Sequence, residues 1–105
     1  MTKESVEQII KTLELVHRRP SMYFGENYNF ETIIHYLHGF HMALFLMNIE
    51  FPRPDNEKDG WDTSYYYVNY PSKAQAEMLS DEYIIERIFS VEIKMWKTFR
   101  DNLEK

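Results

Sequence analysis

The chain contains no cysteine, and its 105 residues include only three glycines and four prolines. Without cysteine it has no disulfide framework and no thiolate nucleophile. Three scattered glycines cannot form a glycine-rich loop that cradles phosphates. No apolar run approaches the roughly twenty residues that a membrane helix needs, and the N-terminus lacks a hydrophobic signal region. We therefore expect a cytoplasmic protein with no membrane partner.

Aromatic and acidic residues are abundant. Rings make up 16% of the chain, including eight tyrosines and seven phenylalanines, and the net charge is −5. A negative chain is a poor general binder of nucleic acid, because such binding depends on neutralising phosphates. The length fits a single domain over residues 1–105. The composition favours a ring-rich core, a surface that binds other proteins, or both.

A short elbow, residues 18–25, separates two amphipathic segments. Pro20 disfavours helical geometry at Arg19, so the preceding helix is expected to end there. Gly25 can take a positive φ and turn the chain before the next helix. Between them, Met22, Tyr23 and Phe24 predict a buried elbow that fills the gap between two packed helices.

Helical periodicity marks three long segments. Residues 3–18 form the first. Arg18 and Arg19 close this helix, and their positive charge suits the negative end of its dipole. The second starts at Phe30 after an Asn29 N-cap, runs to about Ile49, and is apolar nearly all round. We therefore expect this second helix to be the hub of the domain. The third starts at Ser80 and Asp81, packs against the hub and ends in a polar tail from Arg100.

The sequence thus predicts an all-α fold: a compact bundle of three main helices plus one or two short helices, one of them over residues 71–78. Residues 63–70 are ambiguous, because aromatic and β-branched residues favour a strand. The alternative is an α+β fold with one short strand pair around residues 63–70.

Three histidines follow one another at helical spacing, His35, His38 and His41. Neighbours three apart meet on a helix, so a metal site is conceivable. However, His35 and His41 lie about 120° apart around the axis, and no nearby carboxylate completes a tetrahedral set. We expect satisfied or surface histidines, and neither a metal nor another cofactor.

An acidic and aromatic stretch follows the second helix. Two prolines and many polar residues predict a loop over residues 51–62, with Trp61 directly after Gly60. Not all of the next tyrosines can point inward, so some rings are expected at the surface. Acids with exposed rings suit a basic protein partner. The candidate partner-binding residues are Asp55, Glu57, Asp59, Trp61, Asp62, Tyr65, Tyr66 and Tyr67. Such rings are also compatible with a homodimer.

The elbow carries two resemblances. Its Arg19-Pro20-Ser21-Met22-Tyr23-Phe24-Gly25 run is similar to the start of the ATPase domain of bacterial type II topoisomerases, the gyrase B kind. Together with Gly60-Trp61 and the aromatic C-terminal helix, it also resembles small immunity proteins of polymorphic and contact-dependent toxin systems.

The topoisomerase resemblance implies an acid–amide pair on the helix after the elbow, and residues 33–44 contain none. ATP hydrolysis is therefore not expected. The immunity resemblance implies a non-enzymatic protein that neutralises a cognate toxin, and the acidic charge suits a basic nuclease domain. One alternative is a small-molecule or nucleotide-sensing domain without catalysis. A third is an enzyme that pairs His35 or His38 with an acid.

Overall fold

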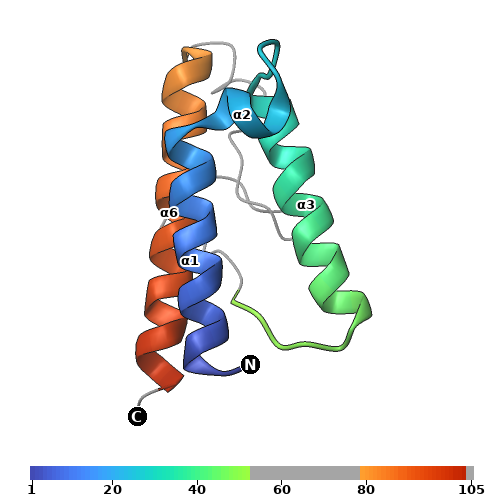
Figure 1. The fold of residues 1–105 in the computed structure, drawn as a ribbon, viewed down its shortest axis with the longest axis vertical. Coiled ribbons are helices and arrows are strands. Elements are labelled where there is room, and N and C mark those ends of the chain that lie inside the picture. Colours follow the sequence, from blue (N-terminus) through green and yellow to red (C-terminus); the bar gives the residue numbers. More distant parts are fainter. Residues whose placement is uncertain (53–78, 104–105) are drawn as a thin grey trace.

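The structure is a computed structural model that describes residues 1–52 and 79–103. Every regular element in those residues is a helix: α1 (Lys3–Arg18), α2 (Pro20–Phe24), α3 (Phe30–Leu46) and α6 (Asp81–Leu103) (Figure 1). The predicted all-α class, with three main helices, is confirmed. The ambiguous stretch over residues 63–70 and the short helix expected over residues 71–78 lie outside the described residues.

The helix starts are set by local side-chain caps. Thr2 accepts the Ser5 N–H at the start of α1. At α3, Asn29 accepts the Thr32 N–H and the Thr32 hydroxyl accepts the Asn29 N–H, which completes a capping box. Ser80 accepts the Tyr83 N–H at the start of α6. The starts predicted at Asn29 and Ser80 are therefore confirmed.

The end of α3 differs from the prediction, because the helix stops at Leu46 and not near Ile49. Asn48 takes the left-handed conformation, with φ 59°. Its N–H bonds to the Phe45 carbonyl, and the Ile49 N–H bonds to the Leu44 carbonyl. These two bonds form a Schellman motif, in which asparagine can replace the usual glycine.

The elbow is only partly buried. Pro20 opens α2, and Gly25 ends it with φ 81°, as expected. Met22 is 68% exposed and Tyr23 is 46% exposed, so the predicted burial of these two side chains is wrong. A five-residue helix packs one face only, and that face carries Phe24, whose ring lies edge-on to Tyr36 at 5.1 Å.

Among the described helices, α6 contacts both of the other long helices. It packs along α1 and also contacts α3 (Figure 1). It has six buried residues, whereas α3 has four. The exposed apolar residues Phe45, Leu46 and Met47 show that the last turn of α3 is not covered on all sides. Among the described helices, α6 and not α3 therefore has the most extensive contacts, and the hub role of α3 in the whole domain stays a prediction. The polar tail predicted from Arg100 is helical as far as Leu103.

The core is formed by the apolar stripes of the three long helices. On α1 the apolar residues at helical spacing are buried, except for Ile9, which is half-buried. The buried core residues are Val6, Ile10, Leu13, Val16, Ile33, Leu37, Leu44, Phe51, Ile84, Ile85, Ile88, Phe89 and Trp96. In the part of the chain that the structure describes, no helix combines the length and apolarity needed to cross a membrane.

Candidate functional site

The predicted partner-binding residues fall in a part of the chain that the structure does not describe. Asp55, Glu57, Asp59, Trp61, Asp62, Tyr65, Tyr66 and Tyr67 all lie between residues 53 and 78. Their assignment stays a prediction from the sequence. The described residues contain three other features that bear on function: a buried polar network, an acidic surface and a small cavity.

A buried polar network joins α3 to α6. Glu92 Oε2 lies 2.7 Å from His41 Nε2 and accepts a hydrogen bond of 2.8 Å from Trp96 Nε1. His41 and Trp96 are fully buried and Glu92 is 2% exposed. The indole N–H of Trp96 can only donate, so Glu92 Oε2 is the acceptor in that bond. One carboxylate oxygen thus contacts a ring nitrogen from each of the two helices.

Aromatic rings surround this network. The ring of Phe51 lies 5.4 Å from that of His41, and the ring of Phe40 lies 5.8 Å from that of Trp96. A catalytic base must reach the proton that it removes, and these buried atoms have no access to solvent. The arrangement is suited to fixing α3 against α6, and not to acting on a substrate in this conformation.

Glu92 was not among the candidate residues from the sequence. It lies four residues after Ile88 and four before Trp96, so it interrupts the apolar stripe of α6 at a core position. An acid at such a position is the signal that could have identified it. His41 is buried on the same face of α3 as Leu37 and Leu44, and its contact with Glu92 makes it one of the satisfied histidines that the sequence predicts.

The histidines of α3 do not form one cluster. His41 is buried against Glu92, whereas His35 is exposed. The pKa of His38 is lowered, mainly by partial burial and further by the neighbouring His35 and His41. Among the described residues, no three potential ligands converge on a point where a metal could bind. Among the described residues, a histidine of α3 meets an acid at His41 and Glu92.

An acidic surface lies where α2, the turn after it and the start of α6 meet (Figure 1). An open hollow of about 490 Å³ lies there, and four carboxylate residues line it: Glu26, Asp81, Glu82 and Glu86. Tyr28 also lines it, and Tyr23 and Tyr83 are exposed on the same helices. We call these seven residues the acidic end.

Two of these carboxylates have structural partners. Asp81 accepts the Phe30 N–H at 3.1 Å, which ties the start of α3 to the start of α6. Glu86 lies 2.6 Å from His17, whose ring stacks on Phe89 at 4.8 Å. Within the described residues, Glu26 and Glu82 have no ion-pair partner. Their charges are therefore available to a basic molecule.

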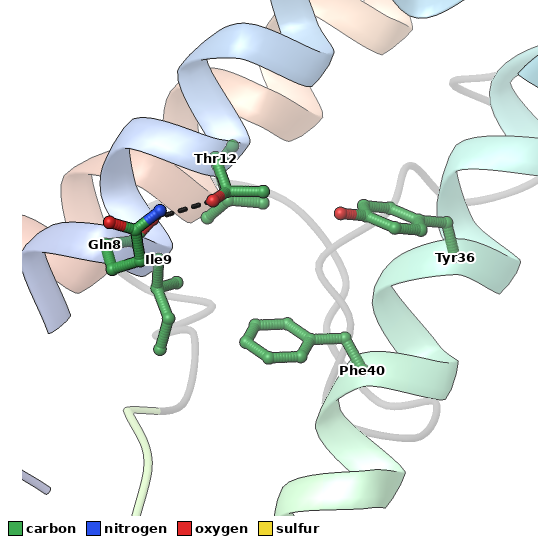
Figure 2. Close-up of a pocket in the computed structure, with 6 residues that line it drawn as sticks. Gln8, Ile9, Thr12, Tyr36 and Phe40 are labelled. Carbon is green, nitrogen blue, oxygen red and sulfur yellow. Dashed lines mark hydrogen bonds between the residues drawn. The ribbon is translucent and has the colours of Figure 1, made fainter. Parts of the chain in front are cut away.

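A small cavity of about 130 Å³ lies between α1 and α3 (Figure 2). The described residues that line it are Gln8, Ile9, Thr12, Leu13, Tyr36 and Phe40. The rings of Tyr36 and Phe40 extend from α3 toward α1. Burial raises the pKa of Tyr36, and the Glu92 carboxylate and Tyr23 act in the same direction.

Comparison of the chain with protein-family models, with curated protein sequences and with solved structures finds no match. The resemblances of the elbow therefore stay predictions.

Proposed function

We propose that this chain is an immunity-type protein, which binds a cognate toxin domain in the cytoplasm and blocks it without catalysis. The expected toxin is basic, such as a nuclease domain, and it is neutralised by covering its active site or its substrate surface. The observation that carries the proposal is the acidic end, where four carboxylate residues and Tyr28 line one hollow and exposed tyrosines lie on the adjoining helices α2 and α6.

The chemistry of this surface suits a basic protein. Opposite charge speeds association, and tyrosines provide contact area at a small cost in conformational entropy. Met22 adds an exposed apolar side chain next to Tyr23 on α2. The predicted segment from Asp55 to Tyr67 has the same composition, so two parts of the chain carry the same kind of recognition chemistry.

The buried network supports the same proposal from another direction. It pairs a histidine with an acid, yet these atoms are enclosed among rings and lie out of reach of a substrate. A rigid helical scaffold with its reactive groups buried is suited to presenting a surface. Inhibition by occlusion requires such a surface and no reactive group.

The first experiment is a search for a toxin reading frame directly upstream of the gene, followed by co-expression of the toxin domain found there with this chain. Expression of the toxin domain alone is expected to stop growth, and this chain is expected to restore it. Failure to restore growth, together with no binding of the two purified proteins, would remove the proposed function.

The second experiment locates the binding surface by matched charge reversals. Glu82→Lys at the acidic end is expected to weaken toxin binding about tenfold at low salt and less at high salt. Glu7→Lys on α1 makes the same change in net charge away from that end and is expected to have little effect. Isothermal titration at two salt concentrations measures both.

Two further variants test the segment assigned from the sequence. Asp59→Lys and Trp61→Ala are expected to weaken binding if that segment contacts the toxin. Normal binding by both variants, with loss in Glu82→Lys, would restrict the interface to the acidic end. Normal binding by all three would show that the toxin contacts another surface.

A further inference from the structure

The cavity between α1 and α3 has the features of a small-molecule site that is separate from the acidic end. Its volume is about 130 Å³, and apolar groups form most of its wall. Ile9 and Leu13 form the wall on α1, while Tyr36 and Phe40 form the wall on α3 (Figure 2). Gln8 and Thr12 are exposed and lie at the opening.

The two aromatic rings that line this cavity pack against other aromatic rings. The Phe40 ring lies 5.8 Å from that of Trp96, which the buried Glu92 fixes through its indole N–H. The Tyr36 ring meets Phe24 edge-on at 5.1 Å. Both rings therefore have packing partners outside the lining of the cavity. A preformed wall lowers the cost of ordering side chains when a ligand binds.

The polar chemistry of the cavity is limited and neutral. None of the described residues that line it is charged. Because the pKa of Tyr36 is raised, its hydroxyl stays protonated at neutral pH and can donate a hydrogen bond. Figure 2 shows this hydroxyl pointing toward α1 across the gap. A charged ligand would lose its hydration here without gaining an opposite charge.

We propose that this cavity binds one small, neutral aromatic molecule about the size of phenol. An enclosed apolar cavity of about 150 Å³ in another protein takes up benzene, and this pocket, which is open to solvent, has a similar volume and can hold a single ring. The ring stacks against Phe40, and its polar group meets the Tyr36 hydroxyl. Burying one such ring corresponds to a Kd on the order of 10 mM.

The test is a titration of the full chain with phenol, toluene and benzoate, followed by ¹H–¹⁵N NMR. Phenol is expected to shift the amide signals of Ile9, Leu13 and Phe40 in a saturable way, and toluene more weakly. Benzoate is expected to bind at least about tenfold more weakly than phenol, because its charge would be buried without a partner. Tyr36→Phe is expected to reduce phenol affinity roughly two- to tenfold, to the level of toluene.

A matched pair of variants on α1 separates the cavity from the surface. Ile9→Trp fills the cavity and is expected to abolish phenol binding, whereas Leu15→Trp adds the same ring at an exposed position and is expected to preserve it. Circular dichroism verifies that both variants are helical, and Tyr36→Phe provides the test if Ile9→Trp fails to fold. The proposal is overturned if phenol gives no saturable shift, if the shifts lie elsewhere, or if Tyr36→Phe binds phenol normally. Toxin binding is measured separately, so either proposal can fail alone.

Discussion

At the residue scale, α6 provides the glutamates of two histidine–glutamate pairs that differ in burial, one with α3 and one with α1. His41 and Glu92 lie 2.7 Å apart in the core, and His17 and Glu86 lie 2.6 Å apart at the surface. Glu92 is 2% exposed and Glu86 is 68% exposed. Breaking a buried pair leaves polar groups without water, whereas an exposed pair is worth little. The two nitrogen–oxygen distances are nearly equal, but the two pairs should therefore contribute very differently to the free energy of unfolding.

We predict that Glu92→Leu lowers the free energy of unfolding by about 3 kcal/mol, because Trp96 loses its acceptor and His41 loses its contact with the carboxylate. The matched Glu86→Leu should cost less than about 1 kcal/mol. Urea unfolding measures both. The double variant His41→Leu/Glu92→Leu should cost about 2 kcal/mol less than the sum of the two single variants. Simple additivity would show that the two residues do not act as a pair.

A second residue-scale prediction concerns His38 and pH. Its lowered pKa means that the folded chain binds a proton at this site less readily than the unfolded chain, whose histidine titrates near an ordinary value of about 6.5. The contribution of His38 to stability is therefore complete above that value and is lost as the pH falls below it. His38→Gln should reduce the loss of stability between about pH 7 and pH 5.

Urea midpoints at the two pH values test this, with His35→Gln as the exposed control on the same helix. The control should keep most of the wild-type slope, because partial burial, and not His35, is the largest cause of the shift. An unchanged slope in His38→Gln would contradict the prediction.

At the scale of elements, the two glycines in the described residues, Gly25 and Gly39, have opposite roles. Gly25 ends α2 with φ 81° and ψ 178°, a region that is almost exclusive to glycine. Gly39 lies inside α3, and a Cβ built there would meet nothing within 4 Å. We predict that Gly25→Ala destabilises the fold by about 2 kcal/mol and that Gly39→Ala stabilises it by about 1 kcal/mol. Thermal unfolding measures both, and a loss of stability in Gly39→Ala would contradict the prediction.

Element boundaries could be predicted where a local side chain sets them. Asn29 and Ser80 cap helices through hydrogen bonds to residues three positions away. The local sequence is therefore sufficient to identify these two helix starts. The end of α3 depends on Asn48 in the left-handed conformation, which the asparagine allows but does not require. Because the prediction for α3 depended on apolar character alone, it placed the end of the helix near Ile49 and not at Leu46.

The roles of the elements could not be predicted in the same way. The apolar surface of α3 suggested a central helix, but centrality depends on which helices meet, and that is a tertiary property. Met22 and Tyr23 are large side chains that the fold leaves exposed. The acidic end joins Glu26 to Asp81 and Glu82, more than fifty residues away, so no local pattern could reveal it.

At the scale of the whole molecule, the described helices form one closely packed pair and one more loosely attached helix. α1 packs along α6, with Val6, Ile10, Leu13 and Val16 all buried. α3 contacts α6 less extensively, and its main polar links are the Phe30–Asp81 hydrogen bond and the His41–Glu92 contact. Local stability follows the density of buried contacts. The molecule should therefore open in parts, with α3 before the α1–α6 pair.

Hydrogen exchange followed by NMR tests this order of opening. In the wild type, amides in the middle of α1 and α6 should exchange most slowly, and those next to the exposed Leu46 and Met47 should be the fastest in α3. In Glu92→Leu, exchange around Leu37 and Leu44 should accelerate by about a hundredfold, corresponding to the loss of about 3 kcal/mol. Amides around Ile10 and Leu13 should accelerate much less, because α1 packs on α6 without using the network. An equal acceleration in all three helices would instead show a single cooperative unit, in which the buried network stabilises the whole bundle and not the attachment of α3 alone.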